Sequence, residues 1–288
     1  MDRHDAREGR TLMEETVMAE RSVSGTRQPA DYGDVAGAVL HALPDEEHRG
    51  ANRLSVALIT DPESFGALLA AFRRVEAAHL RVGRCFLTLD DPNQCLYTSG
   101  HARAKHDLDG DIAYPDDDTD DALAAYDAAV FESAGAALRD PDRAVRWEGV
   151  GNSLVTAPSD IEALVALNRD PGLVLDDVHV VQCLPTTDDT DLLADLPNGY
   201  FACDWTPFEC HAVARRMGER HGYSLIGIGA STLGFHSIVE PGQRDVDALI
   251  ADLRELYGHR DVDAWNELAD LLRGRRCSSS DTRRTSRT

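Results

Sequence analysis

The stretch at residues 206–239, TPFECHAVARRMGERHGYSLIGIGASTLGFHSIV, carries the clearest structural signals in the chain. Its first four residues have the pattern of a capping box with proline at the first helical position, in which Thr206 and Glu209 bond each other's backbone amides. Apolar residues then recur at helical spacing until Gly222, a residue type that readily adopts the left-handed conformation at a helix end. The pattern predicts a helix over residues 207–221.

Further elements are predicted on both sides of this helix. Residues 223–228 and 232–239 have the composition of two strands joined by a short turn, and the second alternates between apolar and polar residues. Residues 246–256 and 262–272 have amphipathic helical patterns, and a short strand is expected at residues 200–203. The C-terminal unit is therefore expected to follow the order β-α-β-β-α-α.

The first half of the chain predicts a second mixed unit. A short helix is expected at residues 34–43 and a strand at residues 54–60. The acidic, proline-containing residues 61–63 are typical of a helix start, which predicts a helix over residues 65–80. A strand at residues 85–89 would complete one βαβ-like or α+β unit.

The rest of this half is expected to contain an aspartate-rich loop at residues 107–121, a helix at residues 121–138 and a weak hairpin at residues 145–156. A second helix is expected at residues 158–167 and a strand at residues 173–184. The prediction is thus an α+β protein of two mixed α/β units. The N-terminal unit would cover residues 31–184 and the C-terminal unit residues 185–273. Residues 1–30 and 274–288 lack an apolar period and are expected to be disordered tails.

The charge composition is unusual. The 288 residues include 51 Asp and Glu against 29 Lys and Arg, for a net charge of −22, and Lys105 is the only lysine. Aspartate-rich, lysine-poor surfaces stay hydrated and resist salting-out, so a salt-rich cytoplasm explains this composition. A high-GC genome, which favours Arg over Lys codons, is the alternative. Either way, nucleic acids and anionic membranes would be repelled, so neither is expected as a partner.

The start of the chain is polar and lacks the apolar region of a signal peptide. No apolar run approaches the roughly 18 residues that a membrane helix needs. Six cysteines in a chain of this length are too few for a disulfide scaffold. We therefore expect a cytoplasmic protein whose cysteines are reduced.

A family resemblance covers residues 185–273. The chain reads Phe201-Ala202-Cys203-Asp204, then a helix that ends in His221-Gly222, then Ser224-Leu225-Ile226-Gly227 and Thr232-Leu233-Gly234-Phe235. This order is similar to that of a bacterial domain-of-unknown-function family, number 4253. The resemblance implies an α+β fold and an unassigned activity, and it assigns no catalytic residue.

Cysteine and histidine residues of the C-terminal unit are the first candidates for chemistry. Cys203 precedes a helix N-terminus, where the helix dipole lowers a thiol pKa, so it is the best-placed nucleophile. His211, His221 and His236 are the candidate partners. Cys203, Cys210, His211 and His221 lie within 19 residues, but their spacing is poor for zinc. Ordinary packed side chains explain these residues better.

Asp107, Asp109 and Asp111 are the candidate metal ligands, because carboxylates suit hard cations such as calcium. However, Gly110 occupies the fourth loop position rather than the sixth, and no bidentate glutamate follows. A solvated acidic loop is the better explanation. The Gly227-Ile228-Gly229 sequence lacks the following helix that a dinucleotide fingerprint requires, so no cofactor is expected.

The sequence therefore favours a non-catalytic binding or regulatory module. The first alternative is a small cysteine- or metal-dependent hydrolase. The second is an acidic antagonist of a basic protein partner, which strong acidity suits.

Overall fold

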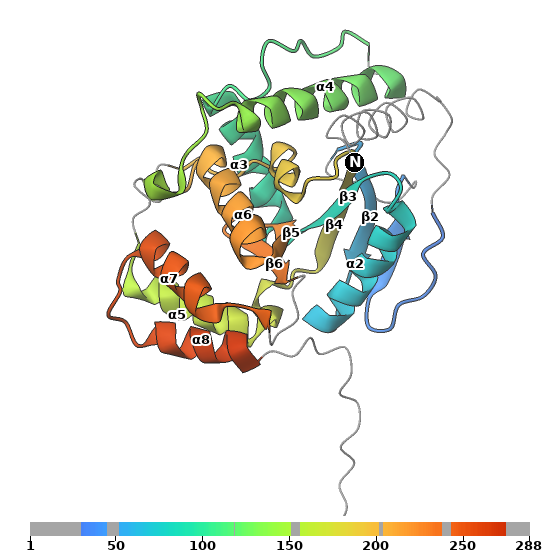
Figure 1. Cartoon of the computed structure of the whole chain (residues 1–288). Coiled ribbons are helices and arrows are strands. Elements are labelled where there is room, and N and C mark those ends of the chain that lie inside the picture. The colour runs from blue at the N-terminus through green and yellow to red at the C-terminus, as the bar shows by residue number, and fades with distance from the viewer. Residues whose placement is uncertain are drawn as a thin grey trace, which may run out of the picture.

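The computed structural model describes residues 30–44, 52–117, 119–150, 156–201, 204–237 and 243–274. These residues contain a six-stranded mixed sheet with helices on both faces (Figure 1). The strand order is β1-β2-β4-β3-β5-β6, with bounds β1 Val39–Ala42, β2 Ser55–Thr60, β3 Arg84–Thr88, β4 Val178–Leu184, β5 Tyr223–Ile228 and β6 Leu233–Ser237. All neighbouring pairs are antiparallel except β3 and β5. The predicted α+β fold class is confirmed.

The helices are α2 Phe65–His79, α3 Pro92–Lys105, α4 Asp120–Arg139, α5 Pro158–Arg169, α6 Pro207–His221, α7 Val246–Tyr257 and α8 Ala264–Gly274, with 3-10 turns η2 Trp147–Gly149, η3 Pro171–Val174 and η4 Asp189–Ala194. Among the described residues, no helix has the length and apolar character needed to cross a membrane.

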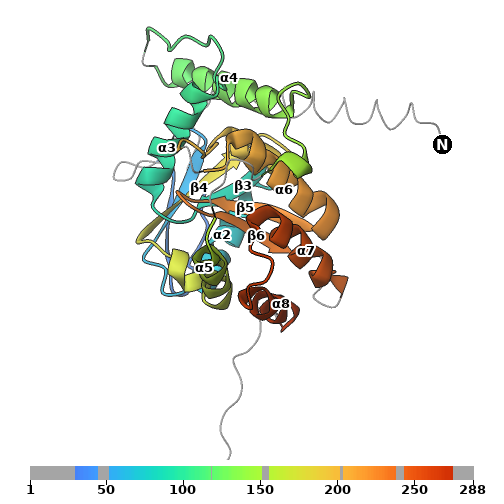
Figure 2. The same cartoon turned by 90° about the vertical axis from the view of Figure 1, so that its left-hand side faces the viewer.

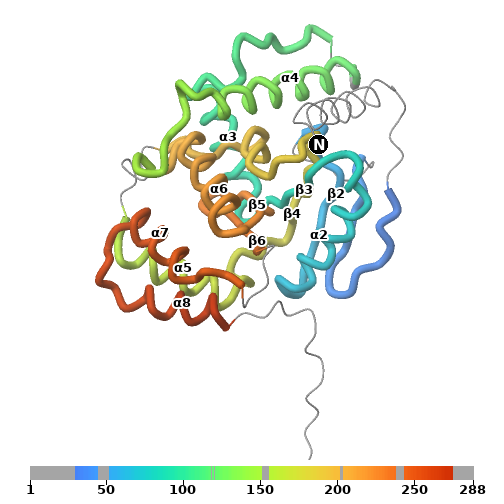
Figure 3. The backbone as a smooth tube through the Cα atoms, in the orientation of Figure 1, coloured from blue at the N-terminus to red at the C-terminus, as the bar shows by residue number. Residues whose placement is uncertain are grey.

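The two faces of the sheet are covered by different helices. Helix α2 packs Leu68, Phe72 and Val75 against one face. Helices α3 and α6 and the turn η4 cover the other face, and α4 packs against η4 and α6 (Figure 2). Helices α5, α7 and α8 lie together (Figure 3). They form a separate apolar cluster in which Trp265 is fully buried. The sheet therefore supports α3.

The C-terminal helix prediction is confirmed in detail. The Thr206 hydroxyl accepts a hydrogen bond from the Glu209 amide at 3.2 Å, and the Glu209 carboxylate accepts one from the Thr206 amide at 2.8 Å. Gly222 ends the helix with φ of 66°. Apart from a strand expected at residues 200–203, the predicted order of this region is also observed, as α6, β5, β6, α7 and α8.

The helix predicted at residues 34–43 and the strand predicted at residues 200–203 are wrong. Residues 34–43 do not form a helix: Gly37 turns the chain with φ of 75°, Val35 pairs with Ala38, and β1 follows as an edge strand against β2. Tyr200 and Phe201 do not form a strand, because the Phe201 amide donates to the carboxylate of Asp204 in a local turn. Ala202 and Cys203 lie outside the described residues.

Smaller differences concern the ends and connections of elements. Helix α2 is capped by Ser64, so it starts after residues 61–63. The first strand of the predicted hairpin is also wrong: residues 145–150 contain the 3-10 turn η2, in which the Val150 amide donates to the Trp147 carbonyl, and residues 151–155 lie outside the described part. Helix α3 was not predicted at all. It starts at Pro92 after Asp91, whose side chain accepts from the Gln94 amide.

The sheet crosses the expected boundary between the two units at residues 184 and 185. Strand β3 pairs in parallel with β5, with Leu87 opposite Gly227. Strands from both sequence halves therefore share one sheet.

Candidate functional site

The predicted histidines lie at separate places and have separate partners. The Nε2 of His221 is 2.8 Å from the Oδ2 of Asp252, which also accepts from the Nε of Arg216 at 2.7 Å. His236 lies on β6, with its Nε2 3.3 Å from a guanidinium nitrogen of Arg73. Both histidines thus have charged neighbours that hold them within the fold.

His211 is buried on α6, and its Nε2 has no hydrogen-bond partner among the described residues. Burial lowers the pKa of this imidazole, which favours its neutral form. The neighbouring Cys210 packs into the core, and burial raises the pKa of its thiol to about 12. Cys203 lies outside the described residues, so its proposed role as a nucleophile stays a prediction.

The candidate metal ligands do not converge in the structure. Asp109 accepts a hydrogen bond from Arg103 at 3.4 Å, whereas Asp107 and Asp111 are exposed. Among the described residues, no group of three or more His, Cys, Asp or Glu side chains is placed to hold a metal ion.

Four rings gather on the surface of α3 and the loop at residues 198–201. We call Tyr97, His101, Tyr200 and Phe201 the aromatic patch. The ring centroids are 4.4 Å apart for Tyr97 and His101, 4.8 Å for His101 and Tyr200, and 5.2 Å for Tyr200 and Phe201. Tyr97 is 55% exposed and Phe201 is 47% exposed. Large apolar surfaces are thus held close together in contact with solvent.

Spacing along α3 explains half of the aromatic patch. Tyr97, His101 and Lys105 are four residues apart, so they lie on one face of the helix. The Nζ of Lys105 donates to the Tyr200 carbonyl at 2.9 Å, which ties the loop to that face. This i, i+4, i+8 spacing was a signal that the sequence offered for the site, but it depends on recognising α3.

Contacts at Asn198 and Gly199 also hold the loop at residues 198–201 in place. The side-chain amide of Asn198 donates to the carbonyls of Gly229 at 3.0 Å and Ala230 at 2.6 Å, in the turn between β5 and β6. Gly199 has φ of 109° and passes so close to the Trp205 carbonyl that a Cβ atom would overlap it. These contacts place Tyr200 and Phe201 beside α3.

A buried polar cluster supports α3 from the interior. Asp195 is 3% exposed and accepts hydrogen bonds from the side-chain amides of Asn52, at 2.8 Å, and Gln182. Arg103 of α3 donates to the backbone carbonyl of Ala194 at 3.1 Å and lies 3.7 Å from the Asp195 carboxylate. Burial raises the pKa of Asp195 to about 6, although Arg103 and the two amides act against this shift.

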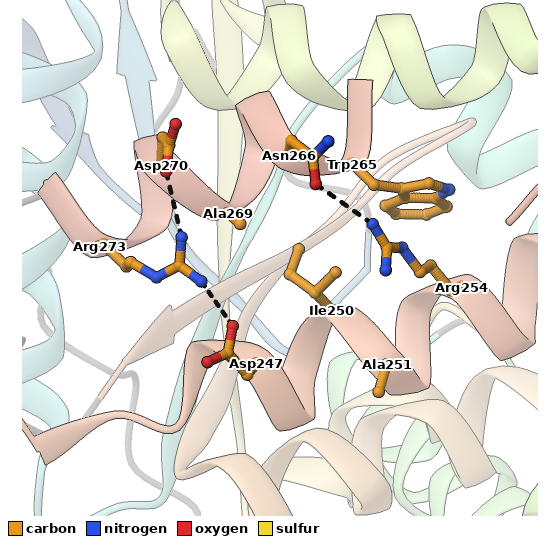
Figure 4. Close-up of a pocket in the computed structure, with 9 residues that line it drawn as sticks. All are labelled: Asp247, Ile250, Ala251, Arg254, Trp265, Asn266, Ala269, Asp270 and Arg273. Carbon is orange, nitrogen blue, oxygen red and sulfur yellow. Dashed lines mark hydrogen bonds and ion pairs between the residues drawn. The ribbon is translucent and has the colours of Figure 1, made fainter. Parts of the chain in front are cut away.

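A pocket of about 310 Å³ lies between α7 and α8 (Figure 4). Ile250, Ala269 and Trp265 supply apolar walls. At its rim, Arg273 pairs with Asp270 at 3.1 Å and with Asp247 at 2.5 Å. The charge of Arg273 is therefore already compensated within the protein, and the pocket is a weaker candidate for a binding site than the aromatic patch.

Comparisons of the chain with protein-family models, with curated proteins and with solved structures found no match. The similarity to family 4253 therefore stays a prediction.

Proposed function

We propose that this protein is a non-catalytic binding module that takes an arginine- or lysine-rich segment of a protein partner on the aromatic patch. The observation that carries the proposal is the gathering of exposed rings. Only 6% of the residues are Phe, Trp or Tyr, yet three of them join His101 at one place on the surface. Tyrosine and other aromatic residues are enriched at the energetic centres of protein interfaces.

The chemistry of the aromatic patch favours a cationic partner. The faces of aromatic rings carry partial negative charge, and they attract ammonium and guanidinium groups placed within about 6 Å. The net charge of −22 adds a long-range attraction for basic proteins and repels acidic ones.

We also propose that the protein works in a salt-rich cytoplasm, as its aspartate-rich composition suggests. At about 1 M salt the Debye length is roughly 3 Å, so long-range attraction is screened. Contacts at van der Waals distance, such as those between rings and guanidinium groups, are screened much less. In that setting the aromatic patch would supply most of the affinity, and the surface charge would mainly preserve solubility.

The arrangement of the histidines supports binding rather than catalysis. His221 pairs with Asp252, His236 lies beside Arg73, and His211 is buried on α6 near Arg215 and Asp191. A general base must reach its nucleophile or substrate within about 3 Å. The three side chains have different charged neighbours, namely Asp252, Arg73 and Arg215.

The test is binding of a fluorescein-labelled ten-residue peptide of alternating arginine and glycine, measured by fluorescence anisotropy at about 2 M KCl. The double variant Tyr97→Ala, Phe201→Ala should bind at least about tenfold more weakly, because central aromatic residues each contribute more than about 1 kcal/mol. The control is the double variant Leu80→Ala, Leu173→Ala, which removes side chains that are 69% and 60% exposed elsewhere. Equal affinity of all three proteins would overturn the proposal, as would equal binding of a glutamate-glycine peptide.

A further inference from the structure

Two cysteines face each other across neighbouring strands in the middle of the sheet. Cys85 of β3 lies directly opposite Cys183 of β4 in an antiparallel pair. They are 4% and 3% exposed, and both belong to the apolar cluster beneath α2. Their side chains therefore leave the same face of the sheet from adjacent positions. Both residues carry thiols in this structure.

The hydrogen bonds of the sheet show whether Cys85 and Cys183 form a hydrogen-bonded or a non-hydrogen-bonded pair. The Cys183 amide donates to the Leu54 carbonyl, next to β2, at 2.9 Å. In an antiparallel strand, the amide and carbonyl of one residue point toward the same neighbouring strand. The backbone groups of Cys183 thus face β2 and point away from β3. Cys85 and Cys183 consequently form a non-hydrogen-bonded pair.

Non-hydrogen-bonded pairs bring side chains closest together. Their Cα atoms are about 4.5 Å apart, compared with about 5.5 Å in hydrogen-bonded pairs. Disulfides span Cα separations of about 4.4–6.8 Å. The register of β3 and β4 therefore gives Cys85 and Cys183 a pairing geometry whose usual Cα separation falls within disulfide range.

We propose that Cys85 and Cys183 are a modification site at which hydrogen peroxide forms a reversible cross-strand disulfide. The thiolate of one cysteine attacks a peroxide oxygen and breaks the O–O bond, which gives a sulfenic acid and, after protonation, water. The second thiol then attacks the sulfenic sulfur, forms the S–S bond and releases a second water. Two thiols lose two electrons in total, and one peroxide is reduced to two waters.

Burial of the pair determines which oxidant can react. The two side chains are only 3–4% exposed, so a small oxidant reaches them more easily than a large one. Hydrogen peroxide is not much larger than water, whereas a peptide disulfide would need a wide opening. The two other buried cysteines are less suited. Cys95 and Cys210 lie on the separate helices α3 and α6, so neither faces a second cysteine across a strand pair as Cys85 and Cys183 do.

The experiment uses the full-length protein, exposed to a small excess of hydrogen peroxide, then alkylated, digested and analysed by mass spectrometry. We expect a linked peptide pair that contains Cys85 and Cys183 and disappears after reduction with dithiothreitol. The melting temperature of the oxidised protein should rise by about 5 °C or more, since a cross-link over a long loop restricts the unfolded chain.

Variants separate this site from the remaining cysteines. Cys85→Ala should abolish both the linked peptides and the rise in melting temperature, whereas Cys95→Ala should retain both. The mass measurement on the unsubstituted protein keeps the test valid if Cys85→Ala does not fold. Oxidised, folded protein in which Cys85 and Cys183 stay as thiols, become sulfinic acids or link to other cysteines would overturn the proposal.

Discussion

Replacement of Asp195 by asparagine should change how the stability of the protein depends on pH. Asp195 is almost fully buried, and burial raises its pKa from 3.8 to about 6. A raised pKa means that the folded protein binds this proton more tightly than the unfolded chain does. The carboxyl group therefore favours folding at low pH, and that contribution is lost as the pH rises from about 4 through about 6. The full change corresponds to about 3 kcal/mol.

The asparagine side chain would keep the shape of the aspartate and remove its charge. The new amide would have to accept a hydrogen bond from one neighbour and donate to the other. Gln182 can adapt to this change, because its Oε1 has no partner among the described residues and a flip of its amide would present that oxygen as an acceptor. The quantity to compare is the free energy of unfolding of Asp195→Asn minus that of the unsubstituted protein. We expect this difference to increase by about 2–3 kcal/mol between pH 4 and pH 7, because only the unsubstituted protein loses stability as the carboxyl group ionises.

The assay is urea unfolding followed by circular dichroism at several pH values and constant KCl, since urea does not alter ionic strength. Asp142→Asn, at an exposed aspartate, is the matched control and should give a nearly constant difference. A constant difference for Asp195→Asn as well would refute the reasoning. A difference that falls with pH would mean that Arg103 outweighs burial and that the carboxylate stabilises the fold.

Three further predictions concern the helix cap, the ion-pair cluster and salt. Thr206→Ala should lower the free energy of unfolding by about 1 kcal/mol, whereas Thr206→Ser should retain it, because only the hydroxyl caps α6; equal loss in both variants would contradict this. Burial raises the pKa of Asp252, but hydrogen bonds from Arg216 and His221 outweigh burial and leave the pKa below 3.8. The stabilisation of the fold by this carboxylate should therefore be present above about pH 4 and be lost on further acidification. Asp252→Ala should then cost about 3 kcal/mol at pH 7 in urea unfolding and less at pH 2, and an equal cost at both pH values would argue against the ion pairs. The melting temperature, measured by calorimetry, should rise between about 0.1 M and 2 M KCl as repulsion among the acidic residues is screened, and an unchanged value would argue against salt adaptation.

Local signals allowed the sequence to predict many individual elements. Helix α6 carries its start and stop signals within 17 residues, from Thr206 to Gly222, and both act as expected. Residues 34–43 mislead because their apolar spacing suits a helix, whereas the tight turn at Gly37 and pairing with β2 make an edge strand. Tertiary pairing overrides a short local pattern in this case.

Long-range contacts could not be derived from local patterns. The parallel pairing of Leu87 with Gly227 joins residues 140 positions apart, and no turn or cap in the sequence indicates it. The aromatic patch has the same origin. Tyr97 and His101 share a helix face, but Tyr200 joins them only because Lys105 and Asn198 hold its loop beside α3.

Hydrogen–deuterium exchange of the full-length protein with and without the arginine-glycine peptide, at about 2 M KCl, tests most directly where a basic segment binds. We expect slower exchange in α3, Pro92–Lys105, and at residues 198–201 when the peptide is present. Protection confined to α7 and α8, or no protection anywhere at saturating peptide, would contradict binding at the aromatic patch.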